Sequence, residues 1–109
     1  MKVSVIGAGS WGTALSQAIV DNKNELLLYA RSEVARDEIN NNHTNSRYLK
    51  NIVLPDEVKA TSDLEEAVKF ADVIVIAVPT KVMRETANKI NQYLDKPKYI
   101  IHVSKGLEM

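Results

Sequence analysis

The most constraining feature of the chain is the stretch Val3–Gly12, which reads V-S-V-I-G-A-G-S-W-G. A short apolar run ends at Gly7, further glycines follow at positions 9 and 12, and a helical pattern begins at once. This spacing predicts a strand, a tight turn and a helix start. In such a turn Gly7 lets the chain reverse, Gly9 removes a side chain where a pyrophosphate would approach, and Gly12 lets the helix pack on the strand.

The predicted helix start gives this turn a physical reason to bind an anion. Free backbone N–H groups and the positive end of the helix dipole would face the phosphates of a dinucleotide, and Ser10 and Trp11 would supply two of the N–H groups. A glycine turn that binds nothing is the alternative, but the position between a strand and a helix favours dinucleotide binding. Trp11 is also compatible with a role as an apolar anchor at the helix start.

Strand and helix patterns alternate through the rest of the chain. Strands are expected at residues 2–6, 25–30, 58–60, 72–78 and 99–103, and helices at about 10–21, 32–41, 64–71 and 80–94. The second strand is apolar on both faces, as a parallel sheet covered by helices requires. This order predicts an open α/β fold of the Rossmann type, a doubly wound parallel sheet with helices on both faces. Ligands of such sheets bind at the carboxyl ends of the strands, here the first and the fourth.

Local details of these elements can also be predicted. The first helix should turn one apolar face inward, made of Trp11, Ala14, Leu15, Ala18 and Ile19. The segment Ser62–Glu65 has the spacing of a capping box, with Ser62 at the N-cap, and Thr80 is expected to cap the helix after the fourth strand. His102 lies in the apolar run of the last strand and is expected in the core rather than in a catalytic role.

The end of the second strand indicates which dinucleotide would bind. An NAD site usually has an acidic residue about 20 residues after the glycines, for the ribose 2′-OH. Here Arg31 and Ser32 follow the strand, and Glu33 comes too late. A guanidinium and a hydroxyl can bind a 2′-phosphate by charge-assisted hydrogen bonds. The sequence therefore favours NADP, although NAD stays open. The alternative interpretation is that Arg31 is a solvated surface residue.

Two further segments reach the same predicted edge of the sheet. Pro79 closes the fourth strand where the nicotinamide half of a cofactor would lie, either as a contact or as part of a shaped turn. Lys105 follows the last strand and would project into the crevice, where its ammonium group could bind a phosphate or polarise a carbonyl. A solvated loop lysine is an equal alternative. No cluster of His, Asp or Glu has metal-ligand spacing, so no metal is expected.

Composition narrows the classes of function. The formal net charge is +0, cysteine is absent, and no apolar run approaches the length of a membrane span. Neither nucleic acid nor a membrane span is therefore expected, and the absence of cysteine fits a reducing cytoplasm. A length of 109 residues predicts a single domain. Because the chain stops just after a predicted strand, we expect it to be a fragment of a longer protein.

Several separate motifs together resemble one known family. They are G-A-G-S-W-G-T-A-L at 7–15, N-S-R-Y-L at 45–49, L-P at 54–55, A-V-P-T-K at 77–81 and H-V-S-K-G-L-E at 102–108. These motifs are similar to those of bacterial NAD(P)-dependent glycerol-3-phosphate dehydrogenases, and the resemblance covers all 109 residues. It implies reversible hydride transfer between NAD(P)H and dihydroxyacetone phosphate, giving sn-glycerol 3-phosphate for phospholipid synthesis in the cytoplasm.

The resemblance also implies roles for individual residues. In that family the residues matching Ser10, Trp11 and Arg31 contact the cofactor, and the lysine matching Lys105 lies near both cofactor and substrate. Family members continue into an all-helical domain that carries the catalytic lysine and most substrate phosphate contacts. Residues 1–109 would thus be the NAD(P)-binding domain of a longer protein, which is expected as a homodimer.

Two other interpretations stay open from the sequence. One is the cofactor domain of a related β-hydroxyacid or ketopantoate-type reductase, which shares the opening motif but is disfavoured by the segment 104–108. The other is a stand-alone nucleotide-sensing module without catalysis.

Overall fold

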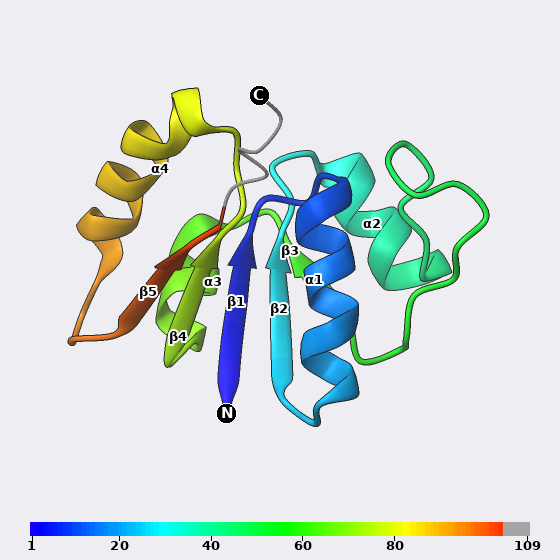
Figure 1. Ribbon diagram of the computed structural model, residues 1–109, viewed down its shortest axis with the longest axis horizontal. Coiled ribbons are helices and arrows are strands. Elements are labelled where there is room, and N and C mark those ends of the chain that lie inside the picture. The colour runs from blue at the N-terminus through cyan, green and yellow to red at the C-terminus, as the bar shows by residue number, and fades with distance from the viewer. Residues whose placement is uncertain (104–109) are drawn as a thin grey trace.

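The computed structural model describes residues 1–103, which form one parallel sheet flanked by helices (Figure 1). The strands are β1 (Lys2–Ile6), β2 (Glu25–Tyr29), β3 (Lys59–Thr61), β4 (Val73–Ile76) and β5 (Tyr99–His102). The helices are α1 (Ser10–Asp21), α2 (Glu33–Asn42), α3 (Leu64–Phe70) and α4 (Thr80–Tyr93). The strand order is β3-β2-β1-β4-β5, with every neighbouring pair parallel. This arrangement confirms the predicted Rossmann-type α/β fold.

β1 lies at the centre of the sheet. β2 and β3 are added on one side of it, and β4 and β5 are added on the other. Val3 pairs with Leu26 of β2 on one side and with Val73 of β4 on the other. The connection after β1 leads to α1 on one face of the sheet, whereas the connection after β4 leads to α4 on the opposite face. Two connections that diverge in this way leave a crevice at the carboxyl ends of the strands, as predicted.

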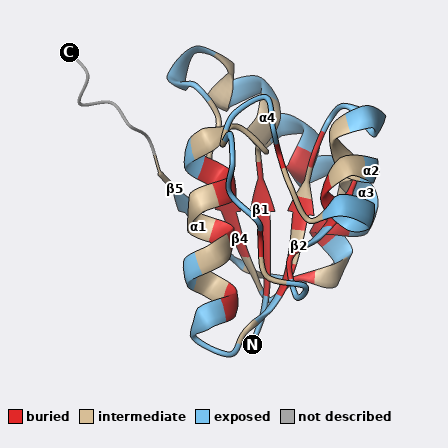
Figure 2. Cartoon of the chain, turned by 90° about the vertical axis from the view of Figure 1, so that its right-hand side faces the viewer, coloured by how far each residue is buried: buried red, intermediate tan, exposed pale blue. Residues whose placement is uncertain are grey.

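The core consists of two apolar clusters, one on each face of the sheet (Figure 2). The cluster on the α1 face includes Val3, Val5, Leu26, Leu28 and Ile39. The cluster on the face of α3 and α4 includes Ile6, Ala67, Val68, Ile74, Ile76 and Ile90. In β2, Leu28 belongs to the first cluster while Leu27 packs against the second. This alternation confirms that β2 is apolar on both faces.

The buried face of α1 differs in part from the prediction: Leu15 and Ile19 pack against the core as expected, but Trp11 and Ala18 do not. The buried residues of this helix are Gly12, Thr13, Ser16 and Val20. Trp11 is 43% exposed, so it is not a core anchor, and Ala18 is exposed as well. The reason is the close approach of the helix to the sheet: a Cβ atom on Gly12 would collide with the carbonyl oxygen of Gly7. Small residues are required at this close approach, so apolar spacing located the helix and the core contacts of Leu15 and Ile19 but missed the burial of Gly12, Thr13 and Ser16.

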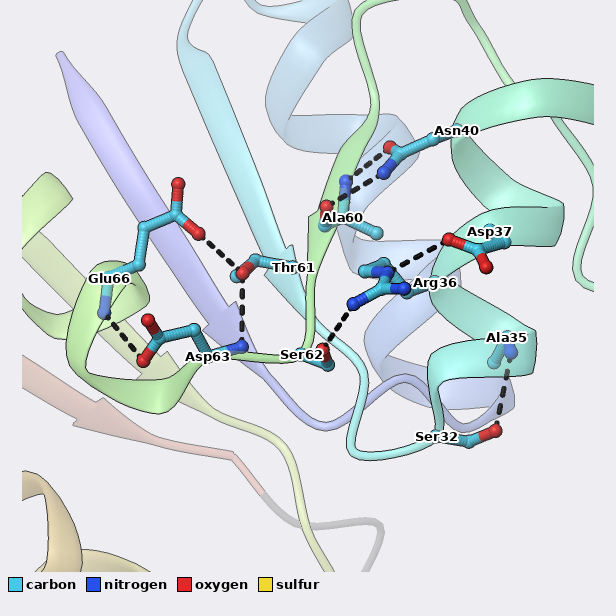
Figure 3. Close-up of polar contacts among 10 residues, drawn as sticks. All are labelled: Ser32, Ala35, Arg36, Asp37, Asn40, Ala60, Thr61, Ser62, Asp63 and Glu66. Atoms are coloured by element: carbon cyan, nitrogen blue, oxygen red, sulfur yellow. Dashed lines mark hydrogen bonds and ion pairs between the residues drawn. The ribbon is translucent and has the colours of Figure 1, made fainter.

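The N-cap of α3 lies one residue later than predicted. The carboxylate of Asp63 accepts hydrogen bonds from the backbone N–H groups of Glu65, at 3.0 Å, and Glu66, at 3.4 Å. The hydroxyl of Ser62 is used differently, because it accepts a hydrogen bond of 2.7 Å from the guanidinium of Arg36 on α2 (Figure 3). The predicted capping box is therefore wrong, and Ser62 joins α2 to the turn before α3.

The start of α4 also differs from the prediction. Pro79 is the N-cap residue, and Thr80 is already the first helical residue, so its hydroxyl makes no capping hydrogen bond. Proline can occupy this position because its fixed φ and missing N–H suit the residue at a helix entrance. The predicted Thr80 cap is wrong, whereas Pro79 still marks the end of β4 and the turn into the helix.

β5 forms an edge of the sheet, and all of its residues are exposed. Tyr99 is 78% exposed and Ile101 is 47% exposed. His102 was expected in the core and is exposed instead, because β5 packs mainly against β4 and no helix of residues 1–103 covers its faces closely. In this described part of the chain, no helix is long and apolar enough to cross a membrane.

Candidate functional site

A cleft of about 880 Å³ opens at the carboxyl ends of β1, β2 and β4. Its walls come from the β1–α1 turn, the β2–α2 turn, the loop after α2 and the first three turns of α4. The predicted site residues that line it are Gly7, Gly9, Arg31, Ser32 and Pro79. The fold therefore brings together residues that are far apart in the sequence, at the crevice where a ligand was expected.

The β1–α1 turn uses its three glycines for different purposes. Gly7 has a φ of 122°, which favours glycine, and a Cβ there would collide with the carbonyl oxygen of Ala77 after β4. Gly12 allows the close approach of α1 to β1. A Cβ on Gly9, by contrast, would meet no atom within 4 Å. The absence of a side chain at Gly7 and Gly12 thus allows the backbone segments of the turn to pack closely, whereas at Gly9 it leaves room for a ligand.

Backbone N–H groups are available at the start of α1. Within residues 1–103, no acceptor pairs with the N–H groups of residues 8–12, and no side chain caps this helix. The first turn also contains no acidic residue that would offset the helix dipole. Ser10, Trp11 and Gly12 form this first turn, and none of the three is among the residues that line the cleft. A run of unpaired N–H groups at a helix N-terminus can hold phosphate oxygens.

Asn45 connects the loop after α2 to the glycine turn. Its side-chain amide donates hydrogen bonds to the carbonyl of Ala8 and to the hydroxyl of Thr13, each at 2.9 Å. The Thr13 hydroxyl donates in turn to the carbonyl of Gly9, at 2.7 Å. Reasoning from residue chemistry did not single out Asn45, although it opens the N-S-R-Y-L motif and so was included in the family resemblance.

Two arginines from different segments contribute to the lining of the cleft. Arg31 follows β2, and Arg47 comes from the loop that Asn45 holds in place. Neither forms an ion pair with a carboxylate in the described part of the chain, whereas Arg36 lies 2.9 Å from the carboxylate of Asp37. The guanidinium of Arg47 lies 5.5 Å from the ring centroid of Tyr48, another lining residue. The sequence prediction identified Arg31 but missed Arg47 and Tyr48.

Ser32 has a structural role that is compatible with ligand binding. It is the N-cap of α2, and its hydroxyl accepts a hydrogen bond of 3.3 Å from the backbone N–H of Ala35 (Figure 3). A hydroxyl that accepts in this way can still donate its own proton to an anion. Arg31 and Ser32 thus offer donors at the entrance of a second helix.

Glu38 lines the cleft, but its carboxylate is occupied by the neighbouring loop. It accepts hydrogen bonds from the hydroxyl of Thr44, at 2.6 Å, and from the backbone N–H of Ser46, at 2.9 Å. These hydrogen bonds, led by that from Thr44, lower the pKa of Glu38. The charged carboxylate therefore stabilises the loop that carries Arg47.

Lys105, the residue predicted to contact the substrate, lies outside the described residues. On the α4 side of the cleft, Lys89 pairs with Glu85 at 3.7 Å, and both residues line it. Among residues 1–103, no three His, Cys, Asp or Glu side chains lie close enough to hold a metal ion.

The sheet order, the glycine turn and the cleft at the switch point define a Rossmann-type nucleotide-binding α/β domain. The family described as "NAD-dependent glycerol-3-phosphate dehydrogenase N-terminus" matches residues 2–109. The chain belongs to this family.

Known relatives and solved structures agree with this assignment. The chain is 46% identical over 107 residues to glycerol-3-phosphate dehydrogenase [NAD(P)+] of Listeria monocytogenes serotype 4b (strain CLIP80459) and 51% identical over 107 residues to that of Streptococcus sanguinis (strain SK36). Each comparison covers 98% of this chain and 32% of the relative. The glycerol-3-phosphate dehydrogenase structure from Saccharomyces cerevisiae is similar with a TM-score of 0.87 at 28% identity, over 97% of this chain and 34% of that one. The chain thus spans about a third of the length of these relatives.

Proposed function

We propose that the chain binds NADP(H) or NAD(H) in the cleft, with the pyrophosphate on the N–H groups at the start of α1. The observation that carries this proposal is the run of N–H groups at residues 8–12, which have no acceptor within residues 1–103, beside the open space at Gly9. Ser10 and Trp11 supply N–H groups, Gly7 and Gly12 fix the turn, and Pro79 borders the nicotinamide half. When bound, the cofactor supplies or accepts the hydride, while the chain binds and orients it.

We further propose a preference for NADP. No carboxylate stands at the end of β2, where an NAD site usually has one for the ribose 2′-OH. Arg31 has no ionic partner among the described residues, and the Ser32 hydroxyl has a proton to donate. Both groups suit a 2′-phosphate.

We also propose that residues 1–109 are the cofactor domain of an NAD(P)-dependent glycerol-3-phosphate dehydrogenase. The longer protein would transfer hydride between NAD(P)H and dihydroxyacetone phosphate, and family membership with the names of the relatives supports this reaction. We expect the main catalytic lysine in the downstream helical domain, and we propose that Lys105 contacts both substrate and cofactor. The chain alone should bind cofactor weakly and should not turn over.

An assay of the longer protein tests this proposal. NADPH oxidation should depend on added dihydroxyacetone phosphate, and Lys105→Ala should slow it roughly hundredfold, because a charge-assisted contact to the substrate is lost. Lys96→Ala provides the control, because Lys96 is an exposed lysine outside the cleft lining. Substantial turnover by the 109-residue chain, or a Lys105→Ala enzyme as active as the control, would contradict the proposal.

Location and assembly belong to the same proposal. We expect the longer protein in the cytoplasm. The absence of cysteine in this domain fits the reducing environment there. It is expected as a homodimer, which sedimentation of the longer protein would test.

A further inference from the structure

Asn45 is nearly fully buried against the β1–α1 turn, with 2% exposure, although its side chain is polar. Its amide holds the carbonyl of Ala8 directly, and it contacts the carbonyl of Gly9 through the hydroxyl of Thr13. The carbonyl of Gly9 also accepts a hydrogen bond of 3.0 Å from the backbone N–H of Thr13. Thr13 is also fully buried. One connected hydrogen-bond network therefore holds two consecutive carbonyl groups of the turn.

The direction of these carbonyls decides what the turn offers to a ligand. In a planar trans peptide the C=O and N–H groups point in opposite directions. Fixing the carbonyl of Ala8 therefore fixes the N–H of Gly9, and fixing the carbonyl of Gly9 fixes the N–H of Ser10. A carbonyl rotated into the cleft would instead place partial negative charge against a phosphate. The carbonyl of Ala8 is the freer of the two to rotate, because Gly9 has no side chain and open space around it, whereas the carbonyl of Gly9 is also held by the backbone N–H of Thr13.

We propose that Asn45 is a positioning residue for the pyrophosphate of the cofactor. Together with Thr13 it holds the carbonyls of Ala8 and Gly9 on the side of the turn away from the ligand, so that the intervening N–H groups face the cleft. This inference rests on the proposed cofactor site and extends it to a residue outside the glycine motif.

The same residue also joins two walls of the cleft. The backbone carbonyl of Asn45 accepts hydrogen bonds from the N–H groups of Tyr48, at 3.1 Å, and Leu49, at 2.8 Å, which closes the turn that carries Arg47. Movement of Asn45 would therefore disturb both the glycine turn and the adjoining loop. Because the pyrophosphate is common to NADH and NADPH, an effect through the glycine turn should weaken the binding of both cofactors.

The substitution Asn45→Asp tests this role, because aspartate has the same shape but, when ionised, cannot donate a hydrogen bond. Kd values for NADH and NADPH would be measured calorimetrically with the 109-residue chain between about pH 5.5 and 8. Two hydrogen bonds are lost, so both Kd values should rise roughly tenfold to hundredfold at pH 8, and by similar factors. As the pH falls, protonation of the new carboxyl restores one donor, and the ratio of Kd to that of the unmodified chain should fall.

Two further variants separate this mechanism from a general loss of structure. Asn42→Asp makes the same charge change at an exposed residue whose side chain is in no hydrogen bond within residues 1–103, and it should leave both Kd values unchanged. Thr13→Val removes the hydroxyl relay at nearly constant volume, and it should raise both Kd values by a smaller factor. If Asn45→Asp fails to fold, Thr13→Val still tests the network.

The results that would overturn the inference are distinct. They are an Asn45→Asp chain that binds like Asn42→Asp, a loss confined to NADPH, a loss that does not diminish at low pH, or unchanged binding by Thr13→Val. Failure of the unmodified chain to bind either cofactor would instead overturn the proposed function, and with it the role of Asn45.

Discussion

Substitution of Gly9 should separate cofactor binding from folding. A Cβ at Gly9 meets no atom within 4 Å, and the residue has φ −77° and ψ −170°, an extended conformation that valine adopts readily. Replacing glycine restricts the unfolded chain, which stabilises the fold by about 0.4–1 kcal/mol. Losing glycine at an N-cap costs a similar amount, about 0.5–1 kcal/mol. These effects nearly cancel, so we expect Gly9→Val to fold with little change in stability.

The size of the expected change follows from the length of the domain. For about 100 residues, 1 kcal/mol corresponds to a shift in Tm of about 4 °C, so the Tm of Gly9→Val should stay within about 4 °C of the unmodified chain. The valine side chain occupies the space proposed for the pyrophosphate. Losing one charge-assisted hydrogen bond there costs about 1.5–3 kcal/mol, so Kd for NADPH should rise roughly tenfold to hundredfold.

The assay combines a circular dichroism melt with a calorimetric titration of NADPH. Gly12→Ala provides the contrast, because its Cβ would collide with the carbonyl oxygen of Gly7 and should destabilise the fold itself. A folded Gly9→Val chain that binds NADPH normally would refute the proposed position of the pyrophosphate. A Gly9→Val chain that unfolds would refute the open space at this turn.

Two further predictions concern charged residues around the cleft. Arg31→Ala should raise Kd for NADPH roughly tenfold to hundredfold and leave Kd for NADH nearly unchanged, whereas the exposed Arg84→Ala should affect neither; equal losses for both cofactors would refute the NADP preference. Glu38→Gln should reduce stability at neutral pH. The pKa of Glu38 is lowered in the folded chain, so its ionised carboxylate stabilises the fold at pH values above the ordinary pKa of 4.5, and this contribution is lost as the pH falls through the lowered pKa. Denaturant unfolding at several pH values would measure the difference from the unmodified chain, with Glu57→Gln as control; a difference that persists in strong acid would contradict this account.

Most of the fold could be predicted from the sequence because local and global signals agree. The apolar runs of β1, β2 and β4 and the glycines between β1 and α1 specify a parallel sheet whose ligand crevice lies at its carboxyl edge. Gly7, Gly9, Arg31, Ser32 and Pro79 therefore line the cleft as expected. Their positions follow directly from the ends of strands, which is where sequence patterns are informative.

The errors arise where packing or competition between polar groups decides the outcome. The burial of Thr13 rather than Trp11 depends on the distance between α1 and the sheet, which apolar spacing does not encode. The cap is Asp63 rather than Ser62, and the Ser62 hydroxyl accepts instead from Arg36, a residue distant in sequence whose position the local pattern does not encode. Asn45 was missed for the same reason, since its partners Ala8 and Thr13 become neighbours only in the folded chain.

The central position of β1 has a consequence for how the site is made and maintained. Val3 pairs with Val73, so two strands that are far apart in the sequence must meet before the cleft has both of its walls. Pairing over such a sequence separation is slow, and during synthesis the glycine turn emerges long before β4 does. A ligand held there would bind only chains in which this pairing has formed, and it would therefore stabilise the whole sheet rather than the turn alone.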